Sequence, residues 1–177
     1  PDAVSLTVIA IPAQFVVDIM KQQAQKKIQY SIIISAGFRE MGAEGIEMEE
    51  KIKIISIENN IRILGPNCLG ILDNYTNFTT SFLPWERVSK PQKGSLSILS
   101  QSGAFAIALL DLATQEGLGI AKMVNYGNRM DIGESTLLPF LADDVHTKVI
   151  AIYMESVDNG RKFLEVAKEC SRKKPIV

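Results

Sequence analysis

Short runs of Val, Ile and Leu alternate along the chain with stretches in which apolar residues recur at helical spacing. Such runs are typical of buried strands, and the spacing is typical of helices with one apolar face. We predict strands at residues 4–11, 30–35, 61–64, 95–99, 120–125 and 148–154, with a further strand starting at 175–177. We predict one helix opening at Pro12, with Phe15, Val16, Ile19 and Met20 on one face, and others at 47–57, 103–115, 131–141 and 161–172. Strands separated by helices indicate an α/β fold with parallel sheets, whose ligands bind at the carboxyl ends of the strands.

The alternation breaks between the third and fourth predicted strands. Pro66 cannot donate to a strand ladder, and the glycines at both ends of residues 65–70 favour turns. Residues 73–92 are polar and are expected to be irregular. We therefore place a domain boundary near Ile71. One domain would comprise residues 1–71, and the second, at 72–177, would be truncated at its C-terminal end.

Three local features refine the predicted helices. The Gly-rich stretch up to Gly45 is expected to be a loop. The helix at 103–115 is apolar on nearly every side, so we expect it to be buried on most sides. Asp131 and Glu134 have the spacing of a capping box. We therefore interpret Asp131 as the cap of the following helix rather than as a catalytic acid.

Composition and charge narrow the function classes. The 177 residues are 46% hydrophobic and 22% charged, and 19 Lys and Arg against 20 Asp and Glu give a formal charge of −1. This balance offers no electrostatic footprint for nucleic acid or an anionic membrane. The sequence contains neither an apolar run long enough to cross a bilayer nor a signal-peptide pattern. Cys68 and Cys170 are too few for a disulfide framework or a zinc site, so we expect a reducing, cytoplasmic setting and no bound metal.

The first candidate site is the segment Ser100-Gln101-Ser102-Gly103, which joins an apolar strand to an apolar helix. Ser102 can cap the helix, and Gly103 permits a close approach to its first turn. The free amides and the dipole at that end favour an anion, and phosphate is the natural guest. The alternative is a plain Ser cap over a core helix. A hydrolase elbow would need Gly at position 100, and His146 lies in a polar run, so we reject a catalytic triad.

Several further loops carry weaker signals. In residues 65–70, Asn67 can bond to backbone or ligand, and Cys68 is either a nucleophile or, as we prefer, a small buried thiol. Glu155 ends an apolar strand and either orients an imidazole or is simply solvated. Pro12 and the run Ser35-Ala36-Gly37 follow the first two strands and could contact a nucleotide.

Taken together, the loops show the motifs of one family. In chain order they are Gly65-Pro66-Asn67-Cys68-Leu69-Gly70-Ile71, Ser100-Gln101-Ser102-Gly103-Ala104, Gly127-Asn128, and Lys148-Val149-Ile150 with Tyr153 and Glu155. This set is similar to the NDP-forming acyl-CoA synthetases, which include ADP-forming acetate–CoA ligase and the α subunit of succinyl-CoA synthetase. The resemblance runs along nearly the whole chain and in the right order.

The resemblance implies a fold and a coenzyme site. Residues 1–71 would be the second half of a Rossmann-like CoA-binding domain, and residues 72–177 would be a flavodoxin-like domain of the succinyl-CoA synthetase type. The resemblance places five residues beside CoA, namely Ile11, Pro12, Ser35, Ala36 and Gly37.

The resemblance also implies a chemistry. In the family, a phosphorylated histidine shuttles the phosphoryl group between an acyl phosphate and a nucleoside diphosphate held by an ATP-grasp unit. The helix that opens at Ser102 and Gly103 would hold the phosphohistidine phosphate, and Glu155 would hydrogen-bond the histidine. Asn67 and Cys68 would lie near the same phosphate.

Parts of the family pattern lie outside this sequence. The glycine-rich phosphate loop would precede Pro1, the phosphorylated histidine would follow Val177, and no ATP-grasp segment is present. His146 matches no catalytic position. We therefore expect an internal fragment that is inactive alone, with ATP or ADP and Mg²⁺ bound elsewhere in the parent enzyme. We expect residues 4–11 to associate with a missing CoA-domain segment or a second copy, because an exposed apolar sheet edge favours pairing.

Three functions stay open on the sequence. The leading hypothesis is a fragment of an ADP-forming acyl-CoA ligase. The second is a ligand-binding, synthetase-like regulatory module of a protein acetyltransferase. The third is an unrelated flavodoxin-like binding domain, which would be favoured if no anion bound near Ser102.

Overall fold

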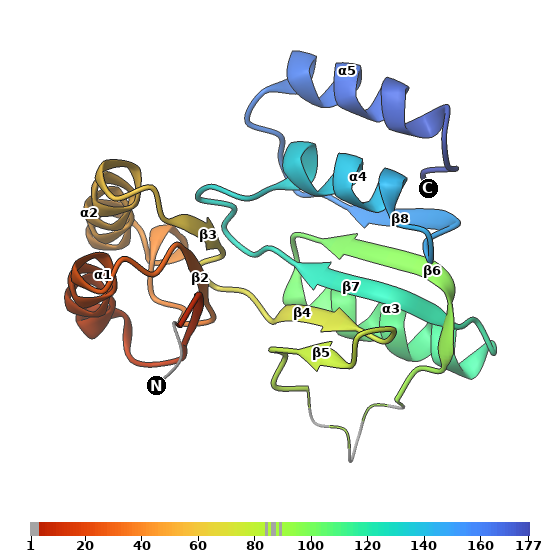
Figure 1. The fold of residues 1–177 in the computed structure, drawn as a ribbon, viewed down its shortest axis with the longest axis horizontal. Coiled ribbons are helices and arrows are strands. Elements are labelled where there is room, and N and C mark those ends of the chain that lie inside the picture. Colours follow the sequence, from red (N-terminus) through yellow and green to blue (C-terminus); the bar gives the residue numbers. More distant parts are fainter. Residues whose placement is uncertain (1–3, 84, 86–87, 89) are drawn as a thin grey trace. The chain divides into compact units, whose positions relative to one another are not determined.

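The computed structural model describes residues 4–83, 85, 88 and 90–177. The chain forms two compact units (Figure 1). The first comprises the chain up to Cys68 together with Tyr126–Ile132, and the second comprises Leu69–Asn125 and Gly133–Val177. A short loop of the later sequence therefore belongs to the first unit.

The first unit is a parallel sheet with helical crossovers. Its strands β1 (Leu6–Ile9), β2 (Tyr30–Ile33) and β3 (Arg62–Leu64) pair in that order. Helix α1 (Val16–Gln25), preceded by the 3₁₀ turn η1 (Ala13–Phe15), connects the first two strands. The 3₁₀ turn η2 (Arg39–Met41) and helix α2 (Ala43–Glu58) connect β2 to β3. The core between sheet and helices is formed by Ile9, Val16, Met20, Ile33, Phe38, Ile52, Ile61 and Ile63.

The loop 126–132 extends the free edge of β3. The N–H of Met130 donates to the carbonyl of Gly65 at 3.0 Å, and the N–H of Ile132 donates to that of Ile63 at 3.0 Å. The Asp131 carboxylate accepts from the Arg62 side chain and from the N–H of Ile63, with distances between 2.9 and 3.1 Å. Although this loop is not a regular strand, it satisfies the backbone groups that an edge strand leaves open.

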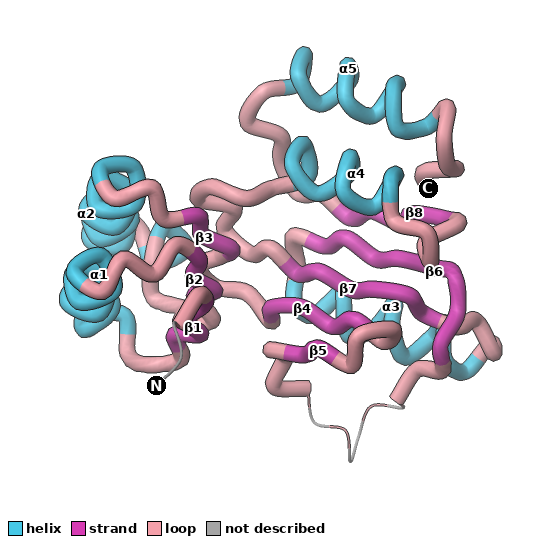
Figure 2. The backbone as a smooth tube through the Cα atoms, viewed as in Figure 1, coloured by secondary structure: helices cyan, strands magenta, loops and turns pink. Residues whose placement is uncertain are grey.

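The second unit is a mixed sheet in the order β5-β4-β7-β6-β8. Strands β6 (Lys93–Ser100), β7 (Ile120–Asn125) and β8 (Val149–Tyr153) run parallel, whereas β4 (Gly70–Asp73) is antiparallel to β7 and to β5 (Phe78–Thr79). In the view of Figure 2, α3 (Gly103–Gln115) lies behind this sheet and α4 (Glu134–Asp143) in front, with α5 (Gly160–Ser171) beside α4. Ile176 bridges to Ile150, as expected for the start of a further strand.

The α/β class is confirmed, with parallel pairing in the first sheet and among β6, β7 and β8. The prediction of parallel pairing is wrong for β4 and β5, which pair antiparallel, and several local predictions are also wrong. The stretch 73–92, of which 84, 86, 87 and 89 lie outside the described residues, contains the end of β4 and all of β5. Helix α2 begins at Ala43, inside the predicted loop. Phe15 is exposed rather than on the inner face of α1. Pro12 precedes the first helical turn with extended ψ of 137°, so it is a cap residue and not the first helical residue.

Helix α3 is less buried than its composition predicts. It buries Ala106, Leu110 and Ala113, while Leu112 is 56% and Phe105 41% exposed. The reason is geometric, because a helix lying on one sheet buries a single stripe.

Asp131 also departs from the prediction. The residue before α4 is Gly133, without a side-chain cap, and Asp131 bonds to β3 instead.

Candidate functional site

The first group of predicted residues lies at the carboxyl edge of the parallel sheet of the first unit. The loops after β1, β2 and β3 meet there, as expected for a ligand site of an α/β sheet. The Ser35 hydroxyl accepts from the N–H of Ile11 at 3.0 Å, and the Ser35 carbonyl accepts from the N–H of Asn67 at 2.9 Å. Ser35 is buried, so it joins the three loops from behind rather than facing solvent.

A pocket of about 810 Å³ opens beside these loops. Pro12, Ala36 and Gly37 line it, whereas Ile11 and Ser35 support the loops and are not part of the lining. Gly37 has φ of +108°, and a Cβ there would lie 2.9 Å from the Cβ of Ala13. Glycine therefore lets the first two loops approach each other. The rest of the wall comes from the neighbouring turns and α2, with Ala13, Gln14, Met41, Ala43, Glu44, Gly45, Glu47, Met48 and Lys51.

Asn67 and Cys68 differ in what they can offer a ligand. Asn67 is exposed, has φ of +55°, and donates from Nδ2 to Oδ1 of Asn128 at 3.2 Å. Cys68 is 4% exposed, and its Sγ donates to the carbonyl of Ile33 at 3.3 Å. This placement fits the small buried thiol that the sequence favoured.

Asn128 was quoted only as part of a motif, and the structure gives it a role in this unit. Its Nδ2 donates to Glu40 at 2.6 Å and to Glu49 at 2.8 Å. Glu49 is 2% exposed and also pairs with Arg39, whose Nε lies 2.6 Å from Glu49 Oε2. Sequence reasoning missed these carboxylates because their partner lies 79 and 88 positions away in the chain.

The second group lies in the second unit, where β6 and β8 end. The Ser102 hydroxyl accepts from the N–H of Phe105 at 3.2 Å, so the predicted cap of α3 is confirmed. The Ser100 hydroxyl donates to the Ser102 carbonyl at 2.6 Å and fixes the turn. Since the first turn of a helix lacks internal acceptors, the amides of Gly103 and Ala104 are left for an outside partner. Such an end favours an anion.

Gln101 joins this helix start to the loop that carries Glu155. Its Oε1 accepts from the N–H of Glu155 at 2.8 Å and of Ser156 at 3.1 Å, and its Nε2 donates to the Ser156 hydroxyl at 3.3 Å. The backbone N–H of Gln101 also donates to the carbonyl of Tyr153 at 3.0 Å. The Glu155 side chain itself is exposed. Gln101 belongs to the segment that the sequence analysis singled out, but no role was predicted for it, because its partners are 52 to 55 residues further along the chain.

His146 stacks on Tyr75 with ring centroids 3.6 Å apart, which is a packing contact. Within the described residues, no three His, Cys, Asp or Glu side chains gather as they would around a metal ion. In the same part of the chain, no helix is both long and apolar enough to cross a bilayer.

The chain is similar in sequence to several known proteins. A family model described as the succinyl-CoA ligase like flavodoxin domain matches residues 93–177. The chain is 40% identical over 177 residues to an acetate–CoA ligase [ADP-forming] I of Archaeoglobus fulgidus, covering all of this chain and 25% of that protein. It is 41% identical to the α subunit of the corresponding ligase I of Pyrococcus furiosus, again over the whole chain and over 37% of the relative.

A solved structure agrees with these relatives. A dinucleotide forming acetyl-coenzyme A synthetase 1 of Ca. Korarchaeum cryptofilum, in complex with phosphate and ADP, superposes with a TM-score of 0.91 at 33% identity. The match covers 99% of this chain and 37% of that one. The chain therefore spans between about a quarter and two fifths of the length of these three proteins.

Proposed function

Because this chain belongs to the ADP-forming acyl-CoA ligase (NDP-forming acyl-CoA synthetase) family, we propose that it binds coenzyme A and handles the transferred phosphoryl group in such an enzyme. The complete reaction converts acyl-CoA, a nucleoside diphosphate and phosphate into the free acid, CoA and a nucleoside triphosphate. The observation that carries the proposal is identity of 40% over all 177 residues with a relative named for this reaction.

The pocket of the first unit is the proposed CoA site. Its volume of about 810 Å³ and its place at the carboxyl ends of parallel strands suit a nucleotide-containing ligand. Pro12, Ala36 and Gly37 would contact CoA through backbone groups, while Ile11 and Ser35 would hold the loops in place. The exposed Lys51 on the pocket wall offers a charge for a phosphate.

The start of α3 is the proposed cradle of the phosphoryl group. We propose that a histidine outside residues 1–177 accepts the phosphoryl group from an acyl phosphate and passes it to the nucleoside diphosphate. The amides of Gly103 and Ala104 and the helix dipole would stabilise its charge. Glu155 would hydrogen-bond the histidine, with Gln101 fixing the loop that carries it. Asn67 and Cys68 would lie near the same phosphate.

The remaining parts of the enzyme are proposed as partners. An ATP-grasp subunit or domain would bind the nucleotide and Mg²⁺, and the name of the Pyrococcus relative, an α subunit, fits a divided enzyme. Strand β1 pairs with β2 alone among the described strands, and its Val8 is 46% exposed. This edge is the proposed contact for a missing CoA-domain segment or a second copy of the chain.

The phosphoenzyme is the direct test of this proposal. The full-length enzyme is incubated with acyl-CoA and radiolabelled phosphate, and protein-bound label is measured after rapid quenching. Glu155→Gln should lower the rate of label incorporation by about tenfold or more, as expected when the group that orients a reactive imidazole loses its charge. Glu165→Gln makes the same chemical change at an exposed position of α5 and should leave the rate unchanged.

Each possible failure identifies a different part of the proposal. Without label in the wild-type enzyme, the phosphoryl role of this family member would be wrong. Equal labelling of wild type and Glu155→Gln would remove Glu155 from the mechanism while leaving the ligase assignment intact.

A further inference from the structure

The side-chain amide of Asn128 is the centre of a polar cluster in the first unit. Both of its N–H groups are used on carboxylates, Glu40 Oε2 at 2.6 Å and Glu49 Oε1 at 2.8 Å. Its Oδ1 accepts from Asn67 Nδ2 at 3.2 Å, and its backbone N–H donates to the carbonyl of Pro66 at 2.9 Å. The amide is therefore fully committed, and it connects segments that are remote in the sequence.

The cluster continues from Asn128 to the lining of the pocket. While one oxygen of Glu40 receives Asn128, the other accepts from the N–H of Gly37 at 2.6 Å and of Phe38 at 3.1 Å. Burial by itself would raise the pKa of Glu40, but the bonds from Asn128 and from these two backbone groups outweigh it and hold that pKa below its usual value. Glu40 is thus a charged acceptor that holds the loop after β2.

Glu49 anchors the same cluster from α2. Its Oε2 lies 2.6 Å from Nε of Arg39, and its Oε1 accepts from the N–H of Arg39 at 3.3 Å as well as from Asn128. Because Glu49 is 2% exposed, its bonds are shielded from water and set a fixed position for Asn128. The chain of bonds thus runs from the turn at Asn67 through Asn128 to Gly37.

The chemistry of the position requires an amide and a close approach. A carboxylate at position 128 would face Glu40 and Glu49 without a proton to share, and an apolar residue would leave both without this donor. The preceding Gly127 allows the fit, since a Cβ there would lie 2.2 Å from the carbonyl oxygen of Asn67.

From this geometry we propose that Asn128 is a positioning residue for ligand binding, which sets the loop at residues 36–38 relative to the turn at Asn67. The inference rests on the proposed function, because the loop lines the proposed CoA pocket and Asn67 belongs to the proposed phosphate site. Asn128 acts through Glu40 and Asn67 and does not itself touch CoA. Its effect is on the affinity for CoA and on the shape of the loop.

The test uses the full-length enzyme with Asn128→Ala and Asn128→Asp. Hydrogen exchange of the peptide covering residues 36–41 reports the loop, and calorimetric titration with CoA reports the site. We expect exchange at Gly37 and Phe38 to rise in both variants and the Kd for CoA to rise about tenfold, as the loss of charge-assisted bonds predicts. The KM for CoA should follow the Kd, with kcat less affected. Asn60→Asp adds the same charge at an exposed turn of this unit and should change neither.

A rescue separates positioning from simple stability. Combining Asn128→Asp with Glu40→Gln exchanges the amide and the carboxylate across the short bond, so protection of Gly37 should return in part. If Asn128→Asp does not fold, hydrogen exchange and the Kd for CoA are compared between wild type and Asn128→Ala, without the rescue.

The outcomes are distinct for the inference and for the proposed function. Unchanged exchange at residues 36–41 in folded Asn128→Ala would overturn the inference, whether or not the Kd for CoA changes. Faster exchange with an unchanged Kd for CoA would also overturn it, because the loop position would then not matter for binding. A wild-type enzyme that does not bind CoA would instead overturn the proposed function, and the exchange data would still decide whether Asn128 holds the loop.

Discussion

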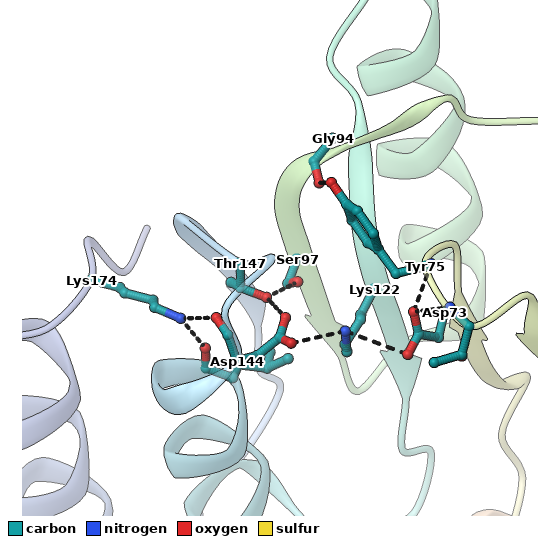
Figure 3. A network of polar contacts seen from close by, with 10 residues as sticks. Asp73, Tyr75, Gly94, Ser97, Lys122, Asp144, Thr147 and Lys174 are labelled. Atoms are coloured by element: carbon teal, nitrogen blue, oxygen red, sulfur yellow. Dashed lines mark hydrogen bonds and ion pairs between the residues drawn. The ribbon is translucent and has the colours of Figure 1, made fainter.

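A buried lysine in the second unit offers the sharpest test of what stabilises this fold. Lys122 lies on β7, and its Nζ is 3.1 Å from Asp144 Oδ1 and 3.4 Å from Asp73 Oδ2 (Figure 3). The exposed fractions of the Lys122, Asp73 and Asp144 side chains are 8%, 13% and 11%. Asp144 also accepts from the Thr147 hydroxyl at 2.6 Å, which in turn lies 2.7 Å from the Ser97 hydroxyl. One cation thus serves two carboxylates in a site with little water.

Both carboxylates are held in the ionised form. Burial alone would raise the pKa of Asp73 and of Asp144. Bonds from the N–H groups of Tyr75 and Thr76 and the charge of Lys122 outweigh it at Asp73, and bonds from Thr147 and Lys122 outweigh it at Asp144. The pKa of each therefore lies below its ordinary value, so both are negative at neutral pH.

Replacing Lys122 by Met keeps the apolar stem and removes the charge. Two buried carboxylates then face each other without a cation, and removal of one partner from a buried pair costs about 3–5 kcal/mol. We expect about 3 kcal/mol, because the bonds from backbone and hydroxyl groups remain. With a urea dependence of roughly 1–3 kcal/mol/M, the unfolding midpoint of the second unit should fall by about 1–3 M.

The assay is urea unfolding followed by Trp85 fluorescence. Trp85 is the single tryptophan and packs against the core of the second unit, so it reports the unit that holds Lys122. Lys173→Met is the matched control, since the Lys173–Asp143 pair belongs to the same unit but its side chains are 51% and 68% exposed. Exposed pairs contribute little, so the control midpoint should stay within error.

The pH dependence tests the electrostatic origin of the effect. A carboxylate whose pKa is lowered by folding stabilises the fold above its unfolded pKa of about 3.9 and loses that contribution as pH falls through the folded pKa. The gap between wild type and Lys122→Met should therefore be wide at pH 7 and narrow below about pH 4, where protonation of Asp73 and Asp144 begins to remove their contribution. A gap below about 1 kcal/mol at pH 7, or one that persists unchanged at pH 3, would refute the reasoning.

Two further substitutions test the loops that carry the proposed sites. Ser102→Ala removes the acceptor for the N–H of Phe105 and should cost about 1 kcal/mol in the same Trp85-monitored titration; a midpoint equal to wild type would mean that the cap contributes nothing. Gly127→Ala should speed hydrogen exchange throughout the first unit, because its Cβ would collide with the turn at Asn67. Gly42→Ala, in the same unit, also has positive φ but open space and should cost only local strain. Equal effects of the two glycine substitutions would show that the close packing of Gly127 is unimportant.

The sequence predicts best where one physical signal dominates. The parallel strands β6, β7 and β8 lie within two residues of the predicted runs, and α5 lies within one residue of the predicted helix. Each of these strand runs is mostly apolar, and α5 has a strong apolar stripe, so each pattern identifies its element without help from the rest of the fold.

Weaker signals fail where a distant partner decides. Strand β5 has two residues, both exposed, and exists because Leu72 and Asp73 on β4 offer a ladder. The early start of α2 depends on Gly45, where a Cβ would lie 1.8 Å from the carbonyl oxygen of Phe38. We interpreted that glycine as a loop signal, whereas in the structure it allows the helix to pack closely on the preceding turn.

The residues of the candidate site also differ in whether local or distant partners determine their roles. Ser102 was predicted because capping is local, involving a residue three positions away. Gln101 and Asn128 were not assigned roles, because their bonds span 52 to 88 positions and no spacing rule reaches so far. For such residues, a motif resemblance is the only available sequence signal, and it gives the residue without its role.

At Asp131, bonds to a neighbouring strand replace the helix cap that the local sequence pattern predicts, and these bonds hold the loop 126–132 against β3. The pair Asp131 and Glu134 has capping-box spacing, and a cap bond is worth about 1 kcal/mol. In the structure the Asp131 carboxylate instead accepts three bonds from β3, two from the Arg62 guanidinium and one from the N–H of Ile63, and the bond to Asp131 raises the pKa of Arg62. Charge-assisted bonds are the stronger set, so the residue closes the edge of the first sheet and leaves Gly133 to start α4. Because Asn128 lies on the same loop, the bonds of Asp131 to β3 also help to fix the position of Asn128 relative to Glu40 and Glu49.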